Sequence, residues 1–190
     1  MLAQHAASKD RWEQIEAHLH ARAMTLREVL SAHASLITIT LDEADAFLET
    51  QTRIDPAFKE FAARCQARAV PVTILSSGIA PLIERALARN GIAGLPVHAN
   101  GVDPRPEGWV MRFRDPSDNG HDKAAEVRAA RARGSTVVYI GDGYSDYDAA
   151  VAADLRFAKC GRALVAHLRE RNLPFVEFTS FAEVTAHLRI

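Results

Sequence analysis

The chain of 190 residues has 48% hydrophobic and 25% charged residues, a composition typical of globular domains that excludes a disordered or fibrous protein. Its 23 Lys and Arg residues nearly balance 24 Asp and Glu residues, so it lacks the strong basic charge expected of a partner of nucleic acids or anionic membranes. We therefore expect no nucleic-acid and no membrane partner, and a small molecule is favoured instead. Two cysteines, Cys65 and Cys160, are too few for a disulfide framework and indicate a reducing, cytoplasmic setting.

The N-terminal part of the chain predicts helices. Between residues 9 and 68 apolar residues recur at helical spacing, and two capping boxes, Thr25 with Glu28 and Thr40 with Glu43, indicate helix starts. Residues 36–40 are β-prone, but this piece is too short to distinguish from a loop by pattern alone. We expect residues 9–68 to form a small helical region.

After residue 68 short apolar runs alternate with helical segments. Residues 70–75 form a nearly continuous apolar run, typical of a strand buried on both faces, and this strand is expected to end at Ser76. A helix with Pro81 in its first turn follows and is expected to stop at Asn90 and Gly91. The remaining expected elements are a strand at 96–100, a hairpin arm at 109–114, a helix at 122–133, a strand at 136–140, a helix from 146, strands near 155–158 and 175–178, and helices near 162–170 and 180–188. Such alternation predicts an α/β domain over residues 69–190, with a parallel sheet covered by helices on both faces.

Two of the expected strands end in residues suited to phosphate chemistry. In open parallel sheets, ligands bind at the carboxyl ends of the strands, where helix N-termini favour anions. Ser76, Ser77 and Gly78 would place a hydroxyl and backbone N–H groups there, and Asp142, between two glycines, would place a carboxylate for a cation. Each group alone is more often an ordinary turn. Together they suggest a metal-assisted phosphate site.

Lys123 and two later aspartates add to this set. Lys123 opens an expected helix, where the positive end of the helix dipole disfavours a cation by roughly 0.3–1 kcal/mol. A bound anion would explain its position, and the alternative is a solvated lysine lying along the surface beside Asp122. Asp146 follows the glycine turn and could brace the metal loop, whereas Asp148 fits the favourable charge of a helix start.

The order of these motifs resembles a known family. Ser76, Lys123 and the run Gly-Asp-Gly-Tyr-Ser-Asp at 141–146 resemble motifs II, III and IV of the haloacid dehalogenase (HAD) superfamily of phosphohydrolases. The helical region ahead of the serine motif, with the spacing from the lysine to the glycine turn, is similar to the branch that contains phosphoserine phosphatase. The resemblance extends over nearly the whole chain. It implies an HAD-like Rossmannoid core at 69–190 and an α-helical cap at 9–68.

Within that branch the sequence is most similar to the methionine-salvage phosphatases that act on 2-hydroxy-3-keto-5-methylthiopentenyl-1-phosphate. The residues that carry this similarity are Trp12 with Glu13, the segment 25–28 and His-Ala-Asn at 98–100. The resemblance thus implies a hydrolase of phosphomonoesters whose substrate is a small phosphorylated metabolite.

The resemblance also implies a role for each matching residue. Ser76 would hydrogen-bond the phosphoryl oxygens, and Lys123 would neutralise charge on the phosphoryl group and on the nucleophile. Asp142 would bind Mg²⁺, a hard cation suited to carboxylate and phosphate oxygens, and Asp146 would support that loop as a third catalytic residue with Ser76 and Lys123. The substrate-binding residues would be Ser77, Gly78 and Gly143.

The first motif of the family has no counterpart in this sequence. That motif is an apolar strand ending in Asp-x-Asp, whose first aspartate attacks phosphorus and whose second acts as acid and base. The chain's Asp-x-Asp, at 146–148, belongs to motif IV and follows a glycine turn. The family places motif I ahead of the cap, so we expect it upstream of Met1. The chain is then expected to be truncated, to lack the central strand between those carrying Ser76 and Asp142, and to be inactive by itself.

Three alternatives remain open at this point. If Met1 is the true start, the chain is a catalytically inactive, HAD-like phosphate-binding or regulatory protein. Residues 36–40 are the one spare β-prone run that could fill the central position. Residues 115–126 match several requirements of an EF-hand calcium loop, although Asp122 stands where such loops carry an apolar residue. Two histidines, His98 and His121, would contact substrate from loops at most.

Overall fold

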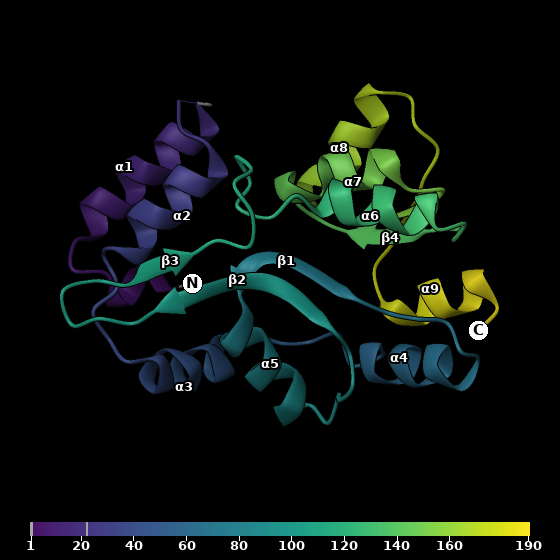
Figure 1. Cartoon of the computed structure of the whole chain (residues 1–190), viewed down its shortest axis with the longest axis horizontal. Helices are drawn as coiled ribbons and strands as arrows, with labels where there is room; N and C mark the ends of the chain where they lie inside the picture. The colour runs from purple at the N-terminus through teal and green to yellow at the C-terminus, as the bar shows by residue number, and fades with distance from the viewer. Residues whose placement is uncertain (1, 22) are drawn as a thin grey trace. The chain divides into compact units, whose positions relative to one another are not determined.

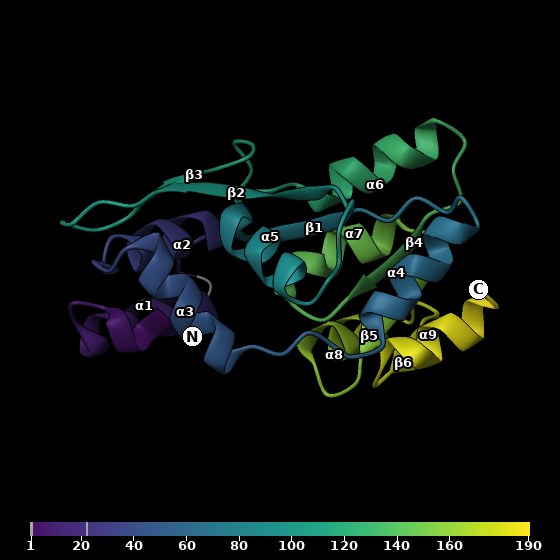
Figure 2. The same ribbon diagram turned by 90° about the horizontal axis from the view of Figure 1, so that it is seen from below.

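The computed structural model describes residues 2–21 and 23–190 (Figures 1 and 2). The chain forms two compact units, and each is built from two separate stretches of sequence. Unit 1 comprises Met1–Ile54 and Thr73–His121, and unit 2 comprises Asp55–Val72 and Asp122–Ile190. Each unit contains a three-stranded sheet with its own helices. The expected α/β class is confirmed.

Unit 1 contains the N-terminal helices and one helix that follows the first strand. They are a 3₁₀ turn at Leu2–His5, α1 (Lys9–His20), α2 (Leu26–Ala34), α3 (Leu41–Gln51) and α5 (Ala80–Arg89). Both expected capping boxes are present: Thr25 exchanges hydrogen bonds with Glu28 ahead of α2, and Thr40 does so with Glu43 ahead of α3. Each capping box provides acceptors for two backbone N–H groups at the start of its helix. Pro81 lies in the first turn of α5, as expected.

The sheet of unit 1 has the order β1 (Ile74–Ile79), β2 (Val97–Asp103), β3 (Val110–Arg112). β1 and β2 are parallel, and β2 and β3 form the expected antiparallel hairpin. The expected bounds of the first strand are wrong at both ends. It begins at Ile74 because its partner β2 begins at Val97, opposite Ile74, so residues 70–73 have no strand to pair with. It also continues through the two serines instead of ending at Leu75.

Trp109 forms the centre of the unit 1 core. It is 2% exposed and packs with Ala34, Ala44 and Leu82 from three helices. Its backbone N–H donates to the carbonyls of Ala34 and Ile37, and its indole N–H donates to the carbonyl of Ile39 at 2.7 Å. The β-prone residues 36–40 therefore bond to this tryptophan and do not form a strand, apart from an isolated bridge between Ile37 and Ala6. The idea that they fill a central strand position is wrong.

Unit 2 is a parallel sheet with helices on both faces. Its elements are α4 (Phe58–Ala67), α6 (Lys123–Ala132), β4 (Val138–Gly141), a 3₁₀ turn at Tyr144–Asp146, α7 (Tyr147–Ala152), β5 (Leu155–Lys159), α8 (Ala163–Glu170), β6 (Val176–Phe178) and α9 (Phe181–Leu188). The strand order is β4-β5-β6, and both pairings are parallel. Figure 1 shows α6, α7 and α8 on one side of this sheet and α4 and α9 on the other. Phe157 and Phe178 of the sheet pack on Phe61 and Cys65 of α4 and on Val184 of α9.

Two features of this architecture concern the expected organisation. The units cut across the expected border at residue 68, because α1–α3 group with the first sheet whereas α4 groups with the second. Within residues 2–21 and 23–190, β1 pairs with β2 alone and β4 with β5 alone, so each of these strands has one unpaired edge.

Among the described helices, none is both long enough and apolar enough to cross a membrane.

Candidate active site

In unit 1 the expected phosphate-binding residues form a bulge in β1. The strand advances from Leu75 to Ile79 while β2 advances only from His98 to Asn100, so Ser76, Ser77 and Gly78 lie outside the regular ladder. The hydroxyl oxygen of Ser76 accepts a hydrogen bond from the N–H of Gly78 at 3.0 Å. Because a serine hydroxyl has one donor as well as two acceptor sites, that bond leaves the Ser76 O–H to donate elsewhere.

Two buried polar side chains replace the hydrogen bonds that the bulge interrupts. Asn100 is fully buried, and its amide donates to the carbonyl of Ser77 at 2.8 Å while its oxygen accepts from the N–H of Arg114. His121 is 1% exposed, and its Nδ1 lies 3.1 Å from the carbonyl oxygen of Ser76, which requires the proton to be on Nδ1. His121 lies in the loop ahead of α6, as expected, and is buried against β1. His98 is part of the strand β2 and not of a loop, so its expected position is wrong.

Another polar atom of the bulge has no such partner. The hydroxyl oxygen of Ser77 is buried and, among the described residues, makes no hydrogen bond. A buried hydroxyl without a partner costs free energy, so such groups in native proteins are usually satisfied by water or a ligand. The Ser76–Gly78 segment thus offers the O–H of Ser76 and the hydroxyl of Ser77 to a ligand rich in oxygen atoms.

In unit 2 the second group of expected residues follows β4 directly. Asp146 is 6% exposed, and its carboxylate accepts four hydrogen bonds. One oxygen, Oδ2, accepts from the backbone N–H groups of Asp142 and Gly143, both at 2.9 Å. The other, Oδ1, accepts from Lys123 Nζ at 2.7 Å and from the phenol of Tyr139 at 2.8 Å. Asp146 therefore holds the 142–143 loop in place, as the brace expected for it. Asp148 is exposed in the first turn of α7.

Burial and hydrogen bonding shift the pKa of the Asp146 carboxyl in opposite directions. Burial alone would raise its pKa, but the charge of Lys123 and the hydrogen bonds from Lys123 and the two amides outweigh burial, so the pKa of Asp146 lies below its ordinary value. The carboxylate is therefore ionised at neutral pH. It forms a buried ion pair with Lys123, whose side chain is 6% exposed.

Lys123 is buried, so the alternative of a solvated surface lysine is wrong. Its position at the start of α6 is explained by Asp146 and by the hydroxyl of Ser145, which accepts from Nζ at 2.8 Å. A lysine ammonium has three N–H donors. Two are used by Ser145 and Asp146, and within the described part of the chain the third has no hydrogen-bond acceptor, which leaves it for an anionic ligand.

Two glycines expected to face substrate have amides that are already engaged. The N–H of Gly78 donates to Ser76, and the N–H of Gly143 donates to Asp146. Gly141 belongs to the motif IV run, without an expected role of its own, and is required by close packing: a Cβ there would lie 2.9 Å from Oδ2 of Asp146. The first glycine of the Gly-Asp-Gly turn thus makes room for the bracing carboxylate.

Asp142 is the expected metal ligand, and its side chain is exposed at the carboxyl end of β4. Its carboxylate is of the type that Mg²⁺ prefers, and its backbone is fixed by Asp146. The described residues contain no cluster of three or more His, Cys, Asp or Glu side chains placed to hold a metal ion. Asp142 therefore fits one position in the coordination shell of Mg²⁺, and further oxygens from substrate, water or another segment would have to complete it.

The calcium-loop alternative is not supported by the local fold. An EF-hand loop lies between two helices. Residues 115–126 follow the strand β3, and α6 begins at Lys123, inside the motif. Lys123 is also paired with Asp146 and is not part of a ligand shell.

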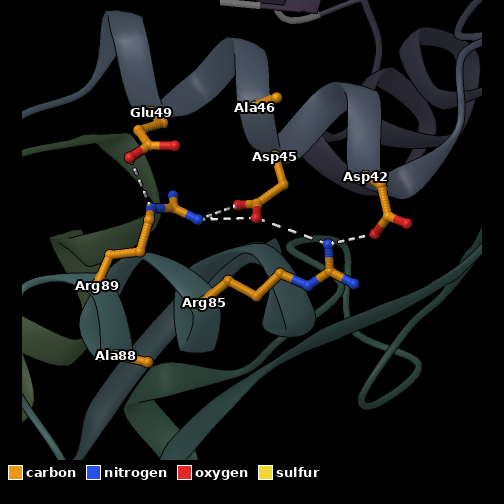
Figure 3. Close-up of a pocket in the computed structure, with 7 residues that line it drawn as sticks. All are labelled: Asp42, Asp45, Ala46, Glu49, Arg85, Ala88 and Arg89. Carbon is orange, nitrogen blue, oxygen red and sulfur yellow. Dashed lines mark hydrogen bonds and ion pairs between the residues drawn. The ribbon is translucent and has the colours of Figure 1, made fainter.

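A groove in unit 1, between α3 and α5, is lined by charged residues (Figure 3). Arg85 pairs with Asp42 at 2.7 Å, and Arg89 pairs with Asp45 at 2.7 Å and lies 4.0 Å from Glu49. Figure 3 shows these side chains pointing toward one another across the groove. These ion pairs join α3 to α5. Since their charges compensate each other, the groove does not offer a site for a charged ligand.

Comparisons with known proteins identify the family of the chain. The sequence matches the family of haloacid dehalogenase-like hydrolases over residues 3–150. It is 31% identical over 176 residues to Pdp3-interacting factor 1 of Schizosaccharomyces pombe, with 88% of this chain and 77% of that protein covered. It is 32% identical to the polyol phosphate phosphatase PYP1 of Saccharomyces cerevisiae, with 77% and 67% covered. A 2-hydroxy-3-keto-5-methylthiopentenyl-1-phosphate phosphatase of Microcystis aeruginosa is 29% identical, with 92% and 83% covered.

A solved structure of a substrate-bound phosphoserine phosphatase complex has the same fold. It aligns with a TM-score of 0.70 and 16% sequence identity, and the alignment covers 98% of this chain and 88% of that one. The chain thus belongs to the haloacid dehalogenase-like hydrolases. Within that family it is a phosphatase, and its fold is that of phosphoserine phosphatase.

The structure brings each group of expected residues together within its own unit. Ser76, Ser77 and Gly78 share the bulge of β1 in unit 1, and the lysine, the metal aspartate and the bracing aspartate share one network in unit 2. Three residues of these networks had no expected role in the site, although two of them belong to quoted motifs: Tyr139, Asn100 and Ser145. Asn100 could have been identified because it is a polar residue in an expected strand, where a buried side chain needs a hydrogen-bond partner.

Proposed function

We propose that this protein is a Mg²⁺-dependent hydrolase of phosphomonoesters whose substrate is a small phosphorylated metabolite. The observation that carries the proposal is the buried Lys123–Asp146 pair at the end of β4, with one N–H of the ammonium left for an anion. The named activities of two relatives, on a polyol phosphate and on 2-hydroxy-3-keto-5-methylthiopentenyl-1-phosphate, support this substrate class.

Each residue of the two networks has a role in this proposal. Ser76 donates its O–H to a phosphoryl oxygen, and Ser77 adds its hydroxyl and its N–H. Lys123 directs its remaining N–H at the phosphoryl group and offsets the charge that develops during transfer. Gly78 and Gly143 leave room for the phosphate to approach the backbone. Asp146 keeps the ammonium and the metal-binding loop in place.

Asp142 is proposed as the protein carboxylate that holds Mg²⁺. Bound there, the ion would polarise the phosphoryl oxygens and orient the substrate. Asp142 supplies a negatively charged oxygen at a fixed backbone position, because its N–H is bonded to Asp146.

We also propose that these 190 residues do not turn over substrate by themselves. Phosphoryl transfer in this family uses a carboxylate nucleophile, and the sequence contains no apolar strand that ends in Asp-x-Asp.

Two further proposals concern the cap and the compartment. Residues 9–68 are proposed to act as the cap that selects the substrate. A reducing cytoplasm is proposed as the compartment, with both Cys65 and Cys160 as free thiols.

The test is a phosphatase assay with Mg²⁺ on a generic phosphomonoester and on a set of polyol phosphates. The 190-residue chain is compared with a version extended by whatever its gene encodes ahead of Met1. We expect hydrolysis by the extended version alone, and its loss when Asp142→Asn removes the metal ligand. Hydrolysis by the 190-residue chain would contradict the proposed inactivity and would require another nucleophile.

A second candidate function applies if the protein has no carboxylate nucleophile. In that case it is an inactive HAD-like phosphate-binding or regulatory protein that uses Ser76 and Lys123 for binding. Titration with inorganic phosphate distinguishes it: binding that is lost in Lys123→Met, together with no hydrolysis by either version, favours this second function.

A further inference from the structure

Tyr139 lies in β4, two residues before the Gly-Asp-Gly turn, and is 7% exposed. Its phenol donates a hydrogen bond to Oδ1 of Asp146 at 2.8 Å. Burial, together with the negative charge of Asp146, raises the pKa of Tyr139 far above its ordinary value. The phenol is therefore protonated at neutral pH, where it can donate to Asp146.

The four donors around Asp146 divide evenly between its two oxygens. Tyr139 and Lys123 bond Oδ1, and the amides of Asp142 and Gly143 bond Oδ2. This division fixes the plane of the carboxylate, because rotation about the Cβ–Cγ bond of Asp146 would break hydrogen bonds at both oxygens. The amide bonds, in turn, fix the backbone from which the Asp142 side chain extends.

We propose that Tyr139 is a positioning residue: its hydroxyl holds the Asp146 carboxylate in the orientation that fixes the 142–143 loop and hence the Asp142 side chain. The proposal rests on the proposed function in one respect, since it takes Asp142 to be the metal ligand. The positioning itself concerns residues of unit 2 alone.

The lysine cannot replace this hydroxyl. Lys123 also bonds Ser145, and its flexible stem allows its ammonium to follow Oδ1 if the carboxylate turns. The phenol is carried by a rigid ring that is buried in the sheet, so its oxygen has little freedom to move. Of the two donors to Oδ1, the tyrosine is the one that resists rotation of the carboxylate.

The experiment compares Tyr139→Phe with the matched control Tyr147→Phe in the 190-residue chain. Both changes remove one phenolic oxygen and keep the ring. The hydroxyl of Tyr147 donates to the carbonyl of Ala163 at 3.2 Å. Amide hydrogen exchange is measured by NMR at Asp142 and Gly143, with Phe157 in β5 as the internal reference, and Mg²⁺ affinity is measured by calorimetry with the metal alone.

In Tyr139→Phe we expect exchange at the two loop amides to accelerate about tenfold, the effect of losing one hydrogen bond to a charged group. We expect the Phe157 amide to remain unchanged and the Mg²⁺ dissociation constant to rise about tenfold, as for other residues that orient a metal ligand. The control should leave the loop amides and the Mg²⁺ affinity as in the parent chain.

The outcomes separate the inference from the proposed function. Unchanged exchange at both loop amides in Tyr139→Phe overturns the inference, and so does equal acceleration at Phe157, which would indicate general destabilisation of the sheet. If the loop amides accelerate alone but the parent chain binds no Mg²⁺, the positioning role stands and the assignment of Asp142 as a metal ligand fails.

Discussion

Replacement of Asp146 by asparagine tests the buried ion pair at the centre of the acidic loop. The two side chains of the pair are 8% and 6% exposed, so solvent screens their interaction little. Asparagine keeps the size of the side chain, but it leaves Lys123 charged, buried and without a counter-charge. Breaking a buried pair in this way costs about 3–5 kcal/mol, which lowers the melting temperature of a chain of this size by roughly 6–20 °C.

The assay is urea and thermal unfolding at pH 7, followed by far-ultraviolet circular dichroism. Asp148→Asn serves as the control, because Asp148 is exposed two residues away and should have little effect. Combining Asp146→Asn with Lys123→Met should restore part of the lost stability, since the double variant no longer buries an unpaired charge. A loss below about 1 kcal/mol in Asp146→Asn, a value typical of exposed pairs, would refute the reasoning.

The same carboxylate predicts a pH dependence with a defined sign. Burial opposes ionisation of Asp146, but the charge of Lys123 and the hydrogen bonds hold its pKa in the folded state below the ordinary 3.8. The unfolded chain therefore binds this proton more readily than the folded chain does. The stabilisation is complete above pH 3.8 and is lost as the pH falls through the lower folded value. Asp146→Asn should lack this loss in acid unfolding curves.

Three further changes test unit 1. Arg89→Ala should lower stability by about 1 kcal/mol through loss of its partly buried pair with Asp45, measured by urea unfolding, and the loss should shrink in 1 M salt if it is electrostatic. Gly108→Ala should reduce the yield of folded protein or lower its melting temperature sharply, because φ is +133° there and a Cβ would lie 2.2 Å from the carbonyl oxygen of Ser35; an unchanged melting temperature would contradict this. Burial lowers the pKa of His33, so stability measured by urea unfolding should fall as the pH drops from 6.5 toward that lower value, and His33→Gln should remove this dependence.

The helix starts and the general order of elements were predictable from sequence because their signals are local. A capping box depends on residues three apart, so Thr25 with Glu28 and Thr40 with Glu43 could be identified directly. The stop of α5 at Asn90, with Gly91 at a φ of +65°, is a local signal of the same kind. Such patterns need no knowledge of what packs against the segment.

The partners of the candidate site residues were not predictable in this way. Lys123 pairs with Asp146 across 23 residues of sequence, and no pattern near the lysine shows whether it meets a carboxylate, a ligand or water. Tyr139 had the appearance of one more apolar strand residue, because its hydroxyl becomes meaningful only once the following turn brings Asp146 back against β4. The family motifs identified the aspartate and the lysine, but only the fold shows that a tyrosine completes their network.

The serine segment shows why the end of β1 was misjudged. Small polar residues after an apolar run usually mark a turn, and a strand that continued through Ser76 and Ser77 would lose ladder bonds. The fold supplies those bonds from side chains distant in sequence: Asn100 donates to the carbonyl of Ser77, and His121 lies against the carbonyl of Ser76. The strand can therefore continue in a bulged form that presents the Ser76 hydroxyl, at the cost of burying two polar side chains. Since a regular strand would need neither Asn100 nor His121, their burial is best explained by the need to hold these serines outside the ladder.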